Sequence, residues 1–328
     1  MSAVRTSSTE LLYFGKVPSR GDFVRSAQHA ALITSLDKWQ SQTMDRLATD
    51  PRWKLIYDAA PATQFAILGT DSAVGLAGHW LASQDASGRR FPFITAGAFD
   101  LAQPRDFAPL GPVALSRLWA RLEQVARVAH AAVELEHAQA SLSGPLDVDV
   151  NPAAAQRAFD DFLETHTVAS LEQMLAASGT RLSVRQATLA LGMLLQPAMA
   201  QGAAKLNKVL CLPLVADAAL KGPVAAYWLA LIVGFFARHP LELGLFITQV
   251  HGRPYMVLGF QGASAATLQT VIDPALLQEQ GVHLLEADWV EDEVDADYGL
   301  RKLSNYLRDP ALSLAQALST YREVFLGV

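Results

Sequence analysis

The sequence predicts an α+β fold, a mixed α/β architecture with an antiparallel sheet flanked by helices in an N-terminal domain and a helix-rich α+β domain after it. Hydrophobic residues make up 51% of the 328-residue chain, which is enough for a substantial core. Short strand-like segments separated by turn residues follow one another within 64–99, as in an antiparallel meander. Longer segments with helical periodicity precede and follow that meander.

The first third of the chain is predicted to consist of one helix and a set of strands. We expect the polar stretch 1–10 to be frayed and a short strand to follow at 11–14. A helix is predicted at 26–47, because apolar residues recur there at close to one helical face and Asp50-Pro51 stops the pattern. Strands with turns between them are then predicted at 64–69, 74–83 and 91–99.

The middle of the chain is predicted to hold an irregular crossing, a long helix and a linker. The crossing contains Pro104, Pro109 and Pro112. One continuous helix is predicted over 113–137, because its apolar residues form one broad face. The turn-rich segment 141–152 lacks helical periodicity and is the best linker candidate. We therefore divide the chain into an N-terminal α+β domain, 1–145, and a helix-rich C-terminal α+β domain, 146–328.

The second half is predicted to be mainly helical, with a hairpin inserted. Asp273-Pro274 supplies an N-cap and a first-turn proline, and Ser313 with Gln316 forms a capping-box pattern, so a helix is expected to begin at each place. Further helices are predicted at 153–177, 183–196 and 223–238, a strand at 205–214, and a hairpin from 243–250 and 254–260.

Charge and cysteine content limit the classes of function and compartment. The formal net charge is -6, which argues against a general nucleic-acid binder. Cys211 is the only cysteine, so no intramolecular disulfide can form and no oxidising compartment is indicated. The N-terminus lacks the apolar stretch of a secretion signal, and the apolar run 223–237 is shorter than the ~20 residues of a membrane helix. We expect a cytoplasmic protein without a transmembrane segment.

Two loops, 15–23 and 85–93, combine glycine, proline, charge and phenylalanine. Such shaped loops on a rigid scaffold are where binding residues concentrate. We predict that the two loops lie together on one face and contact a protein partner, with arginines meeting acidic groups and phenylalanines as partial anchors. The candidate residues are Gly15, Lys16, Pro18, Arg20, Gly21, Asp22, Phe23, Asp85, Gly88, Arg89, Phe91 and Pro92, with Arg25 and Arg90 beside them.

A structural role for the same residues stays open. The glycines and prolines can serve turn geometry alone, and Asp22 or Asp85 can cap a helix or turn. Asp22 can also pair with Arg89 inside the fold. In that case the charges of the two loops are either internal or simply solvated.

Common catalytic, cofactor and metal motifs are missing from the sequence. Gly15-Lys16 lacks both the preceding glycine and the following Ser or Thr of a phosphate-binding loop. The histidines are scattered without a His-x-x-x-His pair, and there is no Gly-x-Ser-x-Gly elbow. We therefore predict no catalytic residue, cofactor or metal. The acidic run 286–297 is interpreted as a solvated loop, with docking through Trp289 on a basic partner surface as the alternative.

Motifs in a specific order carry a family resemblance over roughly 11–140. They are Tyr13-Phe-Gly-Lys-Val-Pro-Ser-Arg-Gly-Asp-Phe23, then Leu36-Asp-Lys-Trp39, and then Ser83-Gln-Asp-Ala-Ser-Gly-Arg-Arg-Phe-Pro92. Together they resemble the TagF (ImpM-type) family of type VI secretion accessory proteins. Gln84 and Phe93 depart from the family's more usual aliphatic residues. The resemblance adds Trp39 to the candidate residues.

The resemblance implies a cytoplasmic, non-enzymatic regulator of type VI secretion in a Gram-negative bacterium. Relatives act after translation and restrain assembly, as repressors, through contact with Fha, a scaffold bearing a forkhead-associated domain. Some members carry an attached phosphatase domain; its metal-binding aspartate motifs are not matched here, so a stand-alone form is expected. The rival hypothesis is a hydrolase or nucleotide-binding enzyme using Asp22, Asp85 and a histidine such as His79, which requires these side chains to converge in a pocket.

Overall fold

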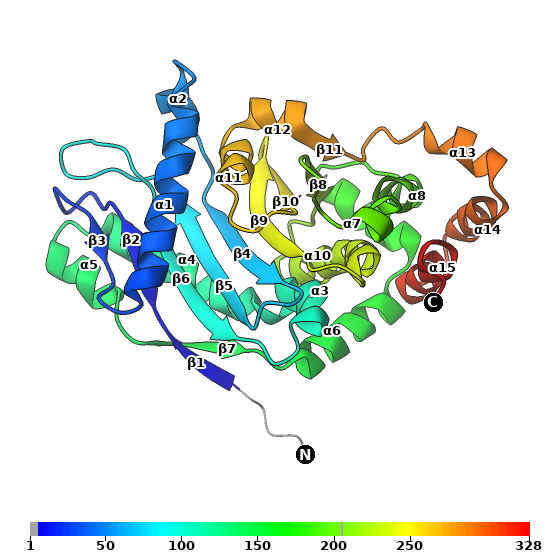
Figure 1. The fold of residues 1–328 in the computed structure, drawn as a ribbon, viewed down its shortest axis with the longest axis horizontal. Coiled ribbons are helices and arrows are strands. Elements are labelled where there is room, and N and C mark those ends of the chain that lie inside the picture. Colours follow the sequence, from blue (N-terminus) through cyan, green and yellow to red (C-terminus); the bar gives the residue numbers. More distant parts are fainter. Residues whose placement is uncertain (1–5, 205) are drawn as a thin grey trace.

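The fold is built around one mixed sheet that runs through both halves of the chain (Figure 1). The computed structural model describes residues 6–204 and 206–328, and within them the sheet has nine strands in the order β11-β8-β10-β9-β4-β5-β6-β2-β3. Neighbouring strands are antiparallel except β11 and β8, which are parallel. The strands are β2 (Leu12–Gly15), β3 (Val24–Arg25), β4 (Thr63–Gly69), β5 (Val74–Leu81), β6 (Phe93–Asp100), β8 (Val209–Pro213), β9 (Glu242–Val250), β10 (Arg253–Gly259) and β11 (Gly281–His283).

The two halves of the chain meet where β4 pairs with β9. Their register runs from Gln64 opposite Ile247 to Gly69 opposite Glu242. The predicted division at 145/146 therefore separates two sequence segments that share one continuous sheet. The division into two domains stays a prediction.

Helices cover both faces of the sheet because its strands alternate between two buried surfaces. Phe65 and Phe246 point to one core, while their neighbours Ala66 and Leu245 point to the other. The first core is covered by α1 (Ala30–Leu47), α2 (Trp53–Asp58), α11 (Ala265–Ile272) and α12 (Pro274–Gln280). The second core is covered by α3 (Pro104–Ala114), α4 (Ser116–Ala131) and α10 (Ala218–Ile232).

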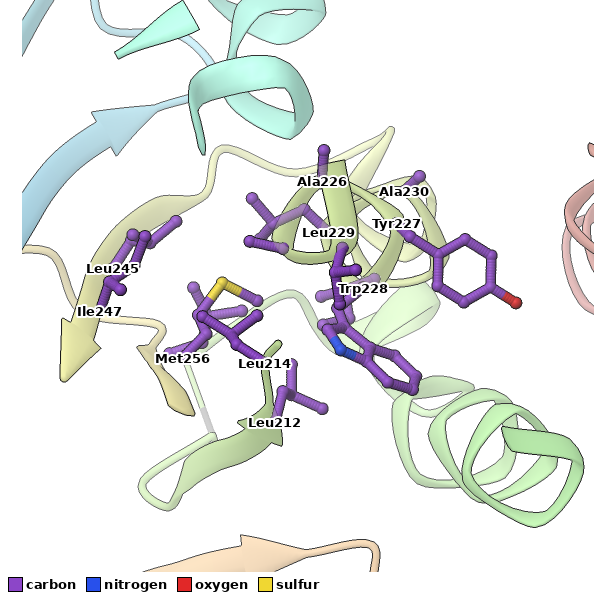
Figure 2. Packing of buried hydrophobic residues seen from close by; sticks show 14 of the residues in the cluster. Leu212, Leu214, Ala226, Tyr227, Trp228, Leu229, Ala230, Leu245, Ile247 and Met256 are labelled. Carbon is purple, nitrogen blue, oxygen red and sulfur yellow. The ribbon is translucent and has the colours of Figure 1, made fainter. Parts of the chain in front are cut away.

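A helical layer surrounds α10 at the C-terminal side of the molecule (Figure 1). Figure 2 shows Trp228 and Leu229 of α10 near Leu212, Leu245 and Met256 of the sheet, in one apolar cluster. The indole Nε1 of Trp228 donates a hydrogen bond of 2.9 Å to the carbonyl of Pro213, which satisfies this buried polar group. The remaining helices are α5 (Leu135–Ser141), α6 (Pro152–Thr165), α7 (Val168–Ala177), α8 (Val184–Leu195), α9 (Ala198–Gln201), α13 (Val290–Ala296), α14 (Tyr298–Leu307) and α15 (Leu314–Leu326), with a 3-10 turn at Val233–Phe236.

The segment Ala218–Phe236 is long and apolar enough to cross a membrane by length and composition. The sequence analysis placed the apolar run at 223–237 and so underestimated the length of this apolar helical segment. Its most apolar window has a mean hydropathy of 1.6, and 67% of that window is buried inside the protein. This burial is typical of a core helix.

Several predicted elements have different boundaries. The prediction of a single helix over 113–137 is wrong, because the backbone of Ala132 and Glu134 is extended and separates α4 from α5. The irregular crossing is also wrong. Pro104 begins α3 at a position where its missing N–H costs nothing, and Pro109 and Pro112 lie inside the helix, which packs on α10 and α6. Packing thus outweighs the lost hydrogen bonds.

The linker prediction for 141–152 is wrong, and so is fraying over 6–10. β7 (Pro145–Asp149) pairs with β1 (Thr6–Glu10) in a separate two-stranded sheet. Leu146 and Val148 alternate with polar residues and are both buried, which is a strand pattern that the turn residues on either side obscured. Residues 1–5 of the expected frayed stretch lie outside the described residues.

Other local predictions are confirmed. β9 and β10 form the expected hairpin, with His251 and Gly252 at positive φ in the turn. Asp273 caps α12, and Ser313 forms a capping box with Gln316 at the start of α15. The helix predicted at 153–177 is divided into α6 and α7 by a second capping box at Thr167.

Candidate functional site

The loops 15–23 and 85–93, which together we call the double loop, are in direct contact. The backbone N–H of Ala86 donates to the carbonyl of Arg20 at 2.9 Å, and Nη2 of Arg89 donates to the carbonyl of Gly21 at 2.5 Å. The prediction that the two loops lie together is therefore confirmed. They sit at one end of the sheet, where β2 leaves and β6 enters, so the rigid strands fix their positions.

The carboxylate of Asp85 holds the double loop together. Its Oδ2 lies 3.0 Å from Nζ of Lys16 and 2.7 Å from Nε of Arg89. Its Oδ1 accepts hydrogen bonds from the backbone and hydroxyl of Ser87, at 2.9 and 2.7 Å, and from the backbone of Arg89 at 3.0 Å. Asp85 thus closes its own turn and ties that turn to the first loop.

The electrostatics of this cluster favour the charged carboxylate. The Asp85 side chain is fully buried, and burial acts to raise its pKa. Hydrogen bonds from Ser87, Lys16 and Arg89 act in the opposite direction and prevail, so the pKa of Asp85 lies well below its ordinary value. The expected alternative of an Asp22–Arg89 pair is wrong, because Arg89 is paired with Asp85 instead.

Gly15 and Gly88 have the positive φ angles expected of loop glycines, and Gly21 does not. The φ of Gly15 is +133°, and a Cβ there would stand 1.9 Å from the carbonyl oxygen of Pro92, so only glycine allows the two loops to approach. A Cβ on Gly21 would meet no atom within 4 Å. Gly21 therefore does not require the conformational freedom of glycine.

An aromatic triangle forms the base of the double loop. Phe23 stacks on Phe14 with ring centroids 5.5 Å apart, and Phe91 meets both rings edge-on at 4.9 and 5.8 Å. The ammonium of Lys16 lies 5.1 Å from the Phe23 centroid. Phe91 and Pro92 are buried and Phe23 is half-buried, so of the two predicted phenylalanine anchors only Phe23 reaches the surface.

A tyrosine that the sequence analysis missed supports the double loop through hydrogen bonds to the backbone next to the second loop. The hydroxyl of Tyr57 donates to the carbonyl of Ser83 at 2.8 Å and accepts from its N–H at 2.7 Å. The hydroxyl of Ser83 in turn donates to the carbonyl of Lys16 at 2.6 Å. Tyr57 is distant in sequence from both loops, so no local pattern could have identified it.

A hollow of about 680 Å³ opens beside the double loop, between β2, β3, α1 and α5. Arg20 and Arg25 line it and form no ion pair with any residue in the described part of the chain. The other two candidate arginines are engaged: Arg89 with Asp85, and Arg90 with Asp58 at 2.6 Å. The hollow is also lined by Tyr13, Phe14, Asp22, Phe23, Val24, Asp37, Ser41 and Gln139.

The remaining candidate residues have different surroundings. Asp22 is exposed, and its Oδ1 accepts a hydrogen bond of 2.8 Å from the N–H of Phe23. Pro18 is half-buried in the first loop. Trp39 is only 4% exposed and packs in the core against Phe65, with centroids 5.3 Å apart. Trp39 therefore supports α1 on the sheet and lies away from the surface.

The groups named for an enzyme, Asp22, Asp85 and His79, are not joined to one another by hydrogen bonds or ion pairs in the described residues. His79 is buried on β5, and burial lowers its pKa to about 4. Within residues 6–204 and 206–328, neither of its ring nitrogens has a hydrogen-bond partner, and no hydrogen bond or ion pair joins it to Asp22 or Asp85. No group of three or more His, Cys, Asp or Glu side chains in the same residues is arranged to hold a metal ion.

The acidic run and the cysteine have structural surroundings. Much of 286–297 forms α13 rather than a loop, and Glu291 pairs with Arg185, so the interpretation as a purely solvated loop is wrong. Trp289 is 44% exposed beside it, and docking on a basic partner stays a prediction. Cys211 is buried in the sheet, and burial raises the pKa of its thiol to about 12.

Comparison with known protein families identifies the N-terminal part. Residues 13–144 match the TagF N-terminal domain, described as type VI secretion system-associated. Residues 13–144 therefore form a TagF N-terminal domain. The matched range contains the complete double loop and ends next to β7, so the shared sheet extends beyond the TagF N-terminal domain. This N-terminal domain associates the chain with the type VI secretion system.

The comparison with solved structures also gives matches. A crystal structure of PA0076 from Pseudomonas aeruginosa PAO1 matches with 22% sequence identity and a TM-score of 0.35. The match covers 42% of this chain and 65% of that one, so it spans less than two thirds of the solved protein. No curated protein matches this chain.

Proposed function

We propose that this protein is a cytoplasmic, non-enzymatic regulator that represses assembly of the type VI secretion system by binding the Fha scaffold. The observation that carries the proposal is the TagF N-terminal domain together with its double loop, a preorganised surface beside an open hollow. A loop held by internal ion pairs loses little conformational entropy on binding, which favours protein recognition.

The contact surface of the proposal is the hollow rather than the whole double loop. Arg20 and Arg25 are available for acidic groups of a partner, whereas Arg89 and Arg90 already have acidic partners in this chain. Phe23, half-buried at the rim, supplies an apolar contact. Arginine and aromatic residues that lose water on association contribute most to interfaces of this kind.

The test is co-purification of Fha with the full chain from a host that carries the secretion system. The double variant Arg20→Glu plus Arg25→Glu is expected to lose Fha by at least about tenfold, because reversed charges meet acidic partner groups. Arg117→Glu plus Arg121→Glu, which changes two exposed arginines of α4, is the matched control and is expected to retain binding. Full Fha binding by the first variant, with intact folding, would exclude this surface.

A second measurement tests the regulatory part of the proposal. Overproduction of the wild-type chain is expected to reduce assembly of the secretion apparatus in living cells, and the Arg20→Glu plus Arg25→Glu variant is expected to lose this effect. Increased assembly with the wild-type chain would contradict repression. Turnover of a substrate by the purified chain would contradict a non-enzymatic role.

A further inference from the structure

The sheet ends at β3, and the outer edge of this strand is open. β3 is the outermost of the nine strands, and within residues 6–204 and 206–328 it pairs only with β2 (Figure 1). Unpaired N–H and C=O groups along such an edge can pair with a strand from another chain. β3 has only two residues, so an added strand needs further contacts beside the edge to be held there.

The backbone of Arg25 points away from β2. In an antiparallel pair, residues that exchange hydrogen bonds with the partner strand alternate with residues that do not. The N–H of Ser26 donates to the carbonyl of Tyr13 at 3.0 Å, and Val24 lies opposite Gly15, so Ser26 and Val24 turn their backbone polar groups toward β2. Arg25 lies between them and therefore turns its N–H and C=O groups to the outer edge.

The hollow of about 680 Å³ lies along this open edge. Val24 and Arg25 of β3 line it, together with Asp37 and Ser41 of α1 and Gln139 of α5. α1 covers one face of the sheet, and α5 packs beside α4, which covers the other face. Residues from both helical layers therefore line the hollow beside β3, where a further strand of the sheet would lie.

The charges of the hollow favour an acidic occupant over a second copy of this chain. The side chains of Arg20 and Arg25 make no hydrogen bond or ion pair within the described residues. The two carboxylates of the lining accept hydrogen bonds inside the chain, Asp22 from the next N–H at 2.8 Å and Asp37 from a serine hydroxyl of α1 at 3.1 Å. Pairing of two copies at this short edge would bring Arg25 against Arg25, and like charges on paired strands repel each other.

We infer that the protein partner binds by β-augmentation: an extended segment of the partner pairs with the outer edge of β3 and places an acidic side chain against Arg25. This inference rests on the proposed function, because it concerns the same hollow and the same partner. The N–H and C=O groups of Arg25 form the main-chain hydrogen bonds to the segment. The guanidinium groups of Arg20 and Arg25 select for its acidic side chains.

The test is hydrogen exchange of the backbone amides, resolved to single residues, in the free full chain and in its complex with Fha. In the free chain, we expect the amides of Val24 and Ser26 to be protected by β2 and the amide of Arg25 to exchange freely. In the complex, we expect exchange at Arg25 to slow by at least about tenfold, because its N–H then donates to the added strand.

The possible failures are distinguishable. Fha binding without protection of the Arg25 amide would overturn the strand addition and leave the proposed function intact. Absence of Fha binding would overturn the proposed function and this inference with it. Protection of Arg25 in the free chain that increases with protein concentration would assign the edge to a second copy and also overturn the inference.

Two variants at one residue separate the backbone from the side chain. Arg25→Gln removes the charge and keeps the N–H, so we expect the affinity for Fha to fall several-fold. Arg25→Pro also removes the N–H, and proline is tolerated on an edge strand where the N–H faces solvent. We expect it to keep the wild-type unfolding midpoint and to lose about tenfold more affinity than Arg25→Gln.

The matched control is Arg117→Gln, which removes an exposed arginine of α4 and is expected to leave Fha binding unchanged. Equal affinities of Arg25→Gln and Arg25→Pro would overturn the main-chain pairing. If Arg25→Pro lowers the unfolding midpoint, the exchange measurement on the wild-type chain decides the question.

Discussion

The double loop and the segment 259–264 both contain glycine beside a buried polar side chain. Only the double loop contains buried charged side chains. In the double loop, the buried carboxylate of Asp85 is compensated by Lys16 and Arg89. Beside α11, the exposed ammonium of Lys208 forms no ion pair in the described chain. A charge-rich motif can thus stabilise the fold through internal ion pairs, while the charge beside a less charged segment stays in solvent.

The largest expected effect is at Gly15, where the two halves of the double loop meet. Gly15→Ala places a Cβ 1.9 Å from a carbonyl oxygen and at a φ of +133°, so we expect it to lower the free energy of unfolding by more than about 3 kcal/mol, or to prevent folding. Urea denaturation measures this. The matched control is Gly21→Ala, expected within about 0.5 kcal/mol of wild type because the added Cβ meets nothing. Equal stability of the two variants would contradict the close approach.

The second effect is the contribution of Asp85 to stability as a function of pH. Its folded-state pKa lies below its unfolded value, so the stabilisation is present above about pH 4 and is lost as pH falls through the folded-state pKa. We expect Asp85→Asn to be less stable than wild type at pH 7 and the difference to shrink below about pH 4. Urea midpoints at pH 7, 5, 4 and 3 measure it. A difference that grows on acidification would show that the carboxylate is not the stabilising species.

The third effect is at Tyr57, which supports the double loop from below. Tyr57→Phe removes both hydrogen bonds to Ser83 and leaves the buried N–H of Ser83 unpaired, whereas the Ser83 carbonyl still accepts from the N–H of Phe91, so we expect a loss of about 1–3 kcal/mol. Tyr298→Phe, at a tyrosine that is 81% exposed, is the control and should match wild type. Chemical denaturation of both variants decides the matter, and a neutral Tyr57→Phe would show that the loop stands without this support.

The smallest effect separates open donors from engaged ones. Arg20→Ala, Arg25→Ala and Lys208→Ala remove charges that have no ion-pair partner in the described chain, so each is expected to change stability by less than about 1 kcal/mol. Arg89→Ala should lower the unfolding midpoint more than any of them, because it leaves Asp85 with one cation fewer. Equal unfolding midpoints for all four variants would contradict the distinction between paired and unpaired charges.

Much of the local structure was predictable, because short-range signals specify it. The hairpin β9–β10, the cap at Asp273 and the capping box at Ser313 depend on neighbouring residues and were found from the sequence. The prediction failed where distant packing prevailed. Pro109 and Pro112 are tolerated in a helix because α3 packs on α10 and α6, and β7 forms because β1 pairs with it.

The candidate site was predictable only in part, because its local loop motifs are visible in the sequence and its long-range ion pairs are not. The contact between the loops could be expected, but the assignment of each charge could not. Arg89 and Arg90 have the same sequence character as Arg20 and Arg25, yet only the first two find carboxylates, and Tyr57 carried no local signal at all.

By itself the sequence determined the α+β class, the positions of caps and hairpins, and the TagF character of the N-terminal domain, because each is encoded in residue types at short spacing. Only the tertiary structure decided that both halves share one sheet through β4 and β9, and which charges are buried in pairs and which remain open. The physical reason is that strand pairing and charge compensation join residues distant in the chain, and their partners are fixed only when the core brings them together.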